Sequence, residues 1–208
     1  MNEFVVKRNE LLAEKVIKGL EKRNMTGYWA PDRAAALKTA LSLIPEGASV
    51  GMGGCFSAAE IGLTDALKSG NYRFIDRTVM DPHEVKLANC DADVFVASAN
   101  AMTEDGILVN IDGNSNRVSN IAFGPKKVVF IVGVNKICPD VDSAMKRARG
   151  VAAPTNAQRF NLNTPCKKTG SCMDCLSPDT ICCQFLITRF SRHKDRIHVI
   201  LVGEPLGF

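Results

Sequence analysis

Five of the chain's eight cysteines fall within 18 residues, and that density of thiols suggests metal or redox chemistry. Cys166, Cys172, Cys175 and Cys182 have the spacing C-x5-C-x2-C-x6-C, and Cys183 is an alternative to the last position. The central C-x2-C places two sulfurs on one tight turn, so both can point at one metal. Prolines and a glycine break the flanking segments into loops, which lets the outer cysteines fold back. Four thiolates suit either tetrahedral zinc or an iron–sulfur cluster.

The spacing alone leaves three interpretations of this segment open. Structural zinc sites more often use two C-x2-C knuckles, and this chain has one. Ferredoxin-type sequences use a tighter C-x2-C-x2-C, which is also absent. The thiols can also be unliganded or redox-paired, because free cysteine behaves as a small buried hydrophobe. We favour an iron–sulfur cluster of the 4Fe–4S type, with zinc as the alternative metal.

A second candidate site is the glycine turn that follows a short apolar segment. Gly51, Gly53, Gly54, Cys55 and Ser57 lie in the sequence Val-Gly-Met-Gly-Gly-Cys-Phe-Ser. Glycines let the backbone approach a ligand, and the N-terminus of a following helix favours an anion. We therefore expect a small anionic molecule here, and a tight turn without a ligand is the alternative. The thiol of Cys55 is either activated by the helix N-terminus or simply a small residue in a tight place.

Polar residues are also concentrated directly after a buried apolar segment, between residues 98 and 113. In open α/β sheets, ligands bind outside the carboxyl ends of the strands. Glu104 and Asp105 are candidate general bases, although Glu-Asp-Gly is also an ordinary turn sequence. The residues expected at this ligand-binding edge are Asn100, Thr103, Asp105, Gly106, Asn110 and Gly113.

The apolar patterns along the chain indicate strands that alternate with helices. This alternation predicts an α/β protein with a mainly parallel sheet flanked by helices, which would position these groups. We expect one domain over residues 1–208, with an N-terminal helix at 1–24 and a cysteine-rich loop at 165–183 as additions. The expected strands are 27–30, 48–52, 72–75, 93–98, 108–111, 127–132, 184–188 and 198–202. The further expected helices are 32–43, one from Ser57 to Gly70 with Ser57–Glu60 as a capping box, 82–89, one from Ser115, 140–149 and 154–160.

The composition excludes several classes of protein. The net charge of +4 is small and dispersed, so we expect no nucleic-acid partner. The chain has no apolar run of 18 residues, which predicts no membrane span, and its N-terminus lacks a signal-peptide core. A cytoplasmic location follows, where thiols stay reduced and a cysteine cluster more often holds a metal than disulfides.

Several segments, in order, resemble the lactate-utilisation (LUD) domain proteins, including the lactate-utilisation protein C type. They are residues 98–113, Asn116-Arg-Val118, Phe123-Gly-Pro-Lys-Lys127, Gly133-Val-Asn-Lys-Ile137 and the glycine turn at 51–54. The resemblance implies a fold similar to the ribose-phosphate isomerase and CoA-transferase group. It also implies a link to an iron–sulfur system that oxidises L-lactate, with redox partner subunits that contain iron–sulfur clusters or flavin. The protein C type typically lacks the cysteine segment.

Two hypotheses of different classes follow. In the first, the protein holds one cluster and takes part in electron transfer during 2-hydroxyacid oxidation, as an accessory subunit of an oxidoreductase. In the second, it binds a phosphosugar or CoA-type molecule, or acts as an isomerase- or transferase-like enzyme on it. The cysteines then hold structural zinc or no metal.

Overall fold

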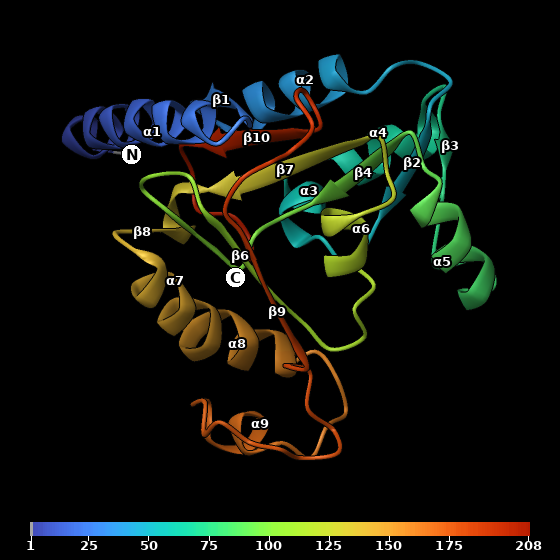
Figure 1. The fold of residues 1–208 in the computed structure, drawn as a ribbon, viewed down its shortest axis with the longest axis vertical. Helices are drawn as coiled ribbons and strands as arrows, with labels where there is room; N and C mark the ends of the chain where they lie inside the picture. Colours follow the sequence, from blue (N-terminus) through green and yellow to red (C-terminus); the bar gives the residue numbers. More distant parts are fainter. Residues whose placement is uncertain (1) are drawn as a thin grey trace.

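The computed structural model describes residues 2–208, and Met1 lies outside them. A six-stranded sheet in the order β1-β10-β7-β4-β2-β3 forms its centre, and every neighbouring pair is parallel (Figure 1). This confirms the predicted α/β class. The strands are β1 (Thr26–Ala30), β2 (Ser49–Met52), β3 (Arg73–Phe74), β4 (Val94–Ala97), β7 (Lys127–Gly133) and β10 (Ile197–Val202).

Helices cover both faces of this sheet, because its central strands bury side chains on both sides. In β7, Val128 and Phe130 face the core beneath α1 (Glu3–Lys22), whereas Val129 and Ile131 face the opposite core. A continuous apolar strand is what a doubly covered parallel sheet requires. The helices that pack on the second face are α2 (Arg33–Leu43), α3 (Phe56–Glu60) and α4 (Leu63–Ser69), whereas α6 (Val118–Ala122) joins α1 on the first. The helix α5 (Pro82–Cys90) follows β3 in the chain.

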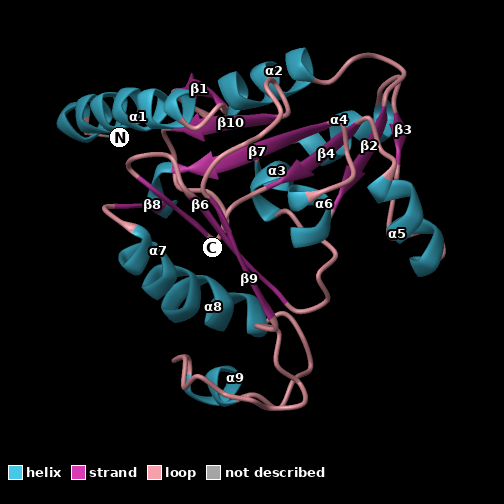
Figure 2. Ribbon diagram, viewed as in Figure 1, coloured by secondary structure: helices cyan, strands magenta, loops and turns pink. Residues whose placement is uncertain are grey.

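A second, smaller sheet has the strand order β8-β5-β6-β9 and is of mixed direction. Its strands are β5 (Ala101–Thr103), β6 (Leu108–Asp112), β8 (Ile137–Cys138) and β9 (Gln184–Thr188). The short 3-10 helix η1 (Val134–Lys136) links β7 to β8. One long helix packs against this sheet, made of α7 (Val141–Arg147), a π-helical turn η2 (Ala148–Ala152) and α8 (Ala153–Ala157) (Figure 2).

Four differences from the sequence expectation concern the expected helices and the cysteine-rich loop. The capping box at Ser57–Glu60 is wrong, because Cys55 is the N-cap and α3 ends before Gly62, whose φ of +79° separates it from α4. The helix expected from Ser115 begins at Val118. The helices expected at 140–149 and 154–160 are joined, since a π-helical turn at Ala148–Ala152 leads directly into α8, which has Pro154 in its first turn.

The fourth difference lies in the cysteine segment, which the sequence assigns to loops. It contains a short helix, α9 (Pro165–Thr169), that ends at Gly170 with a φ of +74°. In Figure 1 this segment lies at the end of the molecule opposite α1. Among the described residues, no helix combines the length and apolar character needed to span a membrane.

Candidate functional site

A cavity of about 870 Å³ lies at the carboxyl ends of β2, β4 and β6. Because β2 and β4 are parallel neighbours, the loops that follow them emerge side by side. The wall includes Gly54–Ser57 from the first loop, Ser98–Asn100 from the second and Ile111–Gly113 from the end of β6. Two predicted ligand-binding segments, which lie more than 40 residues apart, therefore meet at one site.

The cavity wall is strongly cationic. Asp112 is the only acidic side chain of the described residues that lines it. Among residues 2–208, the guanidinium of Arg77 has neither a hydrogen-bond nor an ion-pair partner. The basic side chains in the wall are Arg77, Lys86, Arg117, Lys136 and Arg159. Such an excess of positive charge favours a negatively charged ligand.

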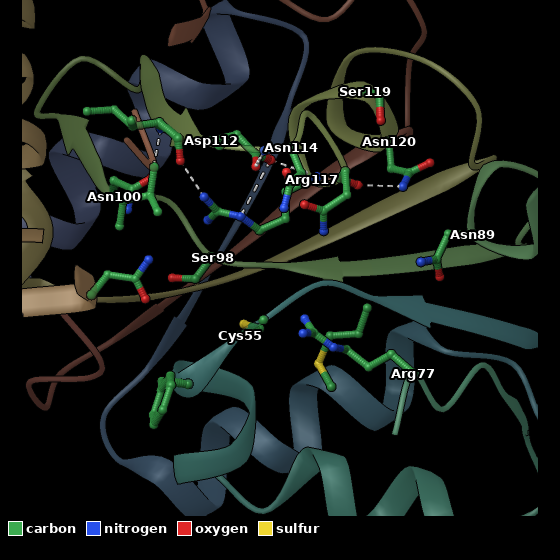
Figure 3. Close-up of a pocket in the computed structure, with 18 of the residues that line it drawn as sticks. Cys55, Arg77, Asn89, Ser98, Asn100, Asp112, Asn114, Arg117, Ser119 and Asn120 are labelled. Atoms are coloured by element: carbon green, nitrogen blue, oxygen red, sulfur yellow. Dashed lines mark hydrogen bonds and ion pairs between the residues drawn. The ribbon is translucent and has the colours of Figure 1, made fainter. Parts of the chain in front are cut away.

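Arg117 is held firmly against the glycine turn. Its Nε lies 3.7 Å from the carboxylate of Asp112, and its guanidinium also donates to the Ile111 carbonyl. Asp112 accepts hydrogen bonds from the backbone N–H groups of Arg117 (2.8 Å) and Val118 (3.1 Å), which orders the loop that carries the arginine. In Figure 3 the guanidinium groups of Arg77 and Arg117 approach the cavity from different sides.

Lys136 lies at the bottom of the site and is only 3 % exposed. Its Nζ donates to the hydroxyls of Ser98 (3.0 Å) and Ser57 (3.1 Å). Burial is the main reason why the pKa of Lys136 is lowered to about 8, and the positive charges of Arg147 and Arg117 act in the same direction. Among the described residues this amine has no carboxylate within ion-pair distance, which is unusual for a buried lysine and identifies Lys136 as a functional candidate.

Aromatic rings and a third arginine complete one side of the cavity. The guanidinium carbon of Arg159 lies 4.3 Å from the ring centroid of Phe56, in cation–π contact, and the Phe208 ring lies 5.0 Å from that of Phe56. A Cβ on Gly54 would lie 3.5 Å from Arg77 and 4.0 Å from Arg159. Burial, followed by the charges of Arg77 and Arg117, lowers the pKa of Arg159, so the three guanidinium groups lie near one another.

The predicted ligand-binding residues divide into two groups. Gly54, Cys55, Ser57, Asn100 and Gly113 line the cavity. Other predicted residues support the wall from behind: Gly51 leaves room for the Asn89 side chain, Gly53 for Arg117, and Asn110 donates to the Ser98 carbonyl (2.9 Å). Burial raises the pKa of the Cys55 thiol, which favours the small-residue interpretation over an activated thiolate.

The remaining predicted residues, Thr103 to Gly106, lie outside the cavity lining and pack against α1. Lys15 donates to Glu104 (2.5 Å), and Arg23 forms an ion pair with Asp105. A Cβ on Gly106, at a φ of +90°, would lie 2.7 Å from the Leu20 nitrogen, so this turn needs a glycine. The two carboxylates thus connect the β5–β6 turn to α1, and neither is among the described residues that line the cavity.

The five clustered cysteines lie close together without forming a closed site. Burial and the nearby thiols of Cys172, Cys166, Cys175 and Cys183 raise the pKa of Cys182 to about 11. Arg149 forms an ion pair with Asp174, next to the cysteine turn. Across residues 2–208, no three His, Cys, Asp or Glu side chains are already arranged to hold a metal ion.

Sequence reasoning missed several of the polar and basic residues that line the cavity. Lys136 closely follows the long buried strand β7, and a lysine at the carboxyl end of a buried strand is a usable signal. Ser98 follows β4 in the same way. Arg77, Asn89 and Arg159 give no such signal, because they reach the site from the β3–α5 loop, from α5 and from the end of α8.

Two comparisons relate the chain to known proteins. The profile of the family described as the LUD domain matches residues 13–202. The fold is similar to the crystal structure of a DUF162 family protein from Deinococcus radiodurans, with a TM-score of 0.55 and 12% sequence identity. That alignment covers 93% of this chain and 98% of the other. No curated protein matches the sequence significantly.

Proposed function

Since the chain belongs to the LUD domain family, we propose that the cavity at its sheet edge binds a small anionic molecule. The observation that carries the proposal is the charge of the wall. Five basic side chains line the cavity, and a single acidic one, Asp112, opposes them among the described residues. That carboxylate already accepts hydrogen bonds from the loop that carries Arg117, which leaves the other cations for a ligand.

The geometry favours a carboxylate or a phosphate as the bound group. Arginine presents a planar fork of donors that matches either anion, and Arg77, Arg117 and Arg159 lie around one glycine turn. The aromatic ring of Phe56 supplies an apolar surface beside them. Ligands of the proposed class include phosphosugars, CoA thioesters and short 2-hydroxy acids such as L-lactate.

Thermal denaturation in the presence of candidate anions tests the proposal. We expect inorganic phosphate, ribose 5-phosphate, acetyl-CoA or L-lactate to raise the melting temperature by linkage. Arg77→Gln should weaken binding of the stabilising anion about tenfold or more, since one charge-assisted hydrogen bond is lost. Arg73→Gln is the matched control, because Arg73 pairs with Asp93 on the surface. If no anion stabilises the protein, or if both variants behave alike, the proposal fails.

A second function is favoured by the gathering of thiols around Cys182. We propose that Cys166, Cys172, Cys175 and Cys182, with Cys183 as the alternative, bind an iron–sulfur cluster. The donor set fits this group, because all five side chains are soft sulfur ligands within one segment. The thiols must move closer together on binding, since the structure shows no preformed metal geometry in the described chain. Zinc is the alternative metal.

An exposed cluster would relay electrons. The cysteine segment lies at one end of the molecule (Figure 1), and Leu176 within it is 98 % exposed, so a redox partner subunit that contains iron–sulfur or flavin can reach it. We propose that such a relay serves the oxidation of a 2-hydroxy acid. Iron, zinc and acid-labile sulfide content of the anaerobically purified protein tests this function. Equal iron and sulfide support it, zinc alone supports a structural site, and an absence of both metals contradicts it.

A further inference from the structure

The buried amine of Lys136 has surroundings that anion binding alone does not require. Its two contacts within the described chain are neutral hydroxyls, those of Ser57 and Ser98, and these lie 3.3 Å from each other. The chain's last residues cover it, since a Cβ on Gly207 would lie 3.1 Å from Nζ. The arginines, by contrast, are arranged around the glycine turn. The cavity therefore has two parts. The arginines around the glycine turn can bind an anion, and the buried amine of Lys136 lies apart from them.

We propose that Lys136 forms a Schiff base with the carbonyl group of an anionic ligand whose carboxylate or phosphate binds to the arginines. This inference rests on the proposed anion-binding function and adds a covalent step to it. The proposed ligand is a carbonyl compound that carries an anionic group. Both a 2-oxo acid and the open-chain form of a sugar phosphate meet this description.

The step needs a neutral amine, and the site makes that form more accessible than it is for an exposed lysine. Burial and nearby cations disfavour the ammonium form, which is how lysine nucleophiles are generally activated. The groups that face Nζ from the surrounding elements are Cys55, Glu60, Arg117 and Arg147, besides the two serines. The two acidic groups among them, Cys55 and Glu60, act to raise the pKa of Lys136, but they do not cancel the lowering that burial causes.

The covalent step balances without an oxidant or a reductant. The lone pair of Lys136 Nζ adds to the carbonyl carbon, which forms the C–N bond and a carbinolamine. The carbinolamine then loses its hydroxyl as water, and both hydrogens of the amine leave with the oxygen. Ser98, 3.0 Å from Nζ, is placed to pass a proton from nitrogen to the departing hydroxyl. The product is an imine with the ligand's anion held by the arginines.

Reductive trapping tests this proposal on the full-length protein. The protein is incubated with pyruvate, with glyceraldehyde 3-phosphate or with uncharged acetone, then reduced with borohydride and analysed by intact mass and peptide mapping. We expect one adduct per chain at Lys136, formed by one or both anionic probes at least tenfold faster than by acetone. The probe that reacts identifies the carboxylate or the phosphate source.

Two variants separate the possible outcomes. Lys136→Arg keeps the positive charge and should abolish the adduct. Lys127→Arg is the control, because Lys127 bonds the Leu43 carbonyl (2.9 Å) away from the cavity, and should keep it. If an anion raises the melting temperature and no probe is trapped at Lys136, the Schiff base is overturned while anion binding stands. If the adduct spreads over surface lysines in both variants, the inference is equally overturned.

Discussion

A Cβ atom on Gly53 would lie 2.5 Å from the Cγ of Arg117, closer than any real side-chain contact. The arginine's aliphatic stem therefore crosses the glycine turn at a point that only glycine leaves open. Arg117 is itself anchored, because its guanidinium and backbone N–H both contact Asp112. The glycine at 53 matters for the position of a neighbouring cation, and its own φ is not in the left-handed region.

Gly53→Ala is thus expected to displace Arg117 and to weaken anion binding about tenfold, through the lost charge-assisted contact. Calorimetric titration of whichever anion stabilises the protein measures the change. Gly150→Ala is the control, since a Cβ there meets no atom within 4 Å. Unchanged affinity in Gly53→Ala would show that Arg117 does not contact the ligand.

Because the amine of Lys136 is buried, we expect an unusual dependence of protein stability on pH. Its pKa is lowered from 10.5 to about 8 in the folded protein, so between these values the unfolded chain binds the proton and the folded chain does not. The free energy of unfolding should therefore rise with pH across this window, by about 3 kcal/mol. Lys136→Met should lack that rise.

Denaturant titrations of both proteins from pH 7.5 to 10.5 measure the difference. Cys55 faces the amine and titrates as well, so the same pair in a Cys55→Ala background is the control. If the free energies of unfolding of the lysine and methionine proteins differ by the same amount at all pH values, the placement of a buried amine here is contradicted.

Asp105→Asn tests whether this carboxylate belongs to the site. The side chain of Asp105 is more than half exposed, and its ion pair with Arg23 joins the β5–β6 turn to α1. We expect a loss of stability below about 1 kcal/mol and no change in anion affinity or in adduct formation. Thermal melts with and without the anion measure stability and anion binding, and the trapping assay measures adduct formation. Loss of anion binding or of the adduct in a folded variant would instead place Asp105 in the site.

Replacement of Cys172 and Cys175 by serine should remove bound metal, because the central C-x2-C supplies two of the four proposed ligands. The visible spectrum and the iron, zinc and sulfide contents are the measurements. Cys90→Ser is the control, since Cys90 lies outside the cysteine segment. A double variant that keeps its full metal content would exclude these two residues as ligands.

The elements that can be predicted from the sequence are those whose residue pattern is local. The apolar run at Lys127–Gly133 identifies a buried strand, and Asp32 caps α2 by accepting from the Ala35 N–H (2.8 Å). The pairing of β6 with β9 is not local, because it joins residues more than 70 positions apart. No short-range pattern records such a contact, so the second sheet was not expected.

The same distinction applies to the site. The glycine turn and Asn100 follow buried strands, and strand ends can be inferred from sequence. Glu104 and Asp105 also follow a strand, but their turn packs closely against Gly19 in α1, and their carboxylates pair with Lys15 and Arg23. Arg159 arrives from a distant helix, where only the folded chain brings it over Phe56.

The cysteine segment and the cavity share a wall. The Cys183 N–H donates to the Asp112 carbonyl (2.9 Å), Ile181 lines the cavity, and Asp112 orders the loop of Arg117. If both proposals hold, a metal that draws the thiols together would act on the same loop that the proposed anion would contact. Thermodynamic reciprocity then applies: whatever factor the metal imposes on anion affinity, the anion imposes on metal affinity.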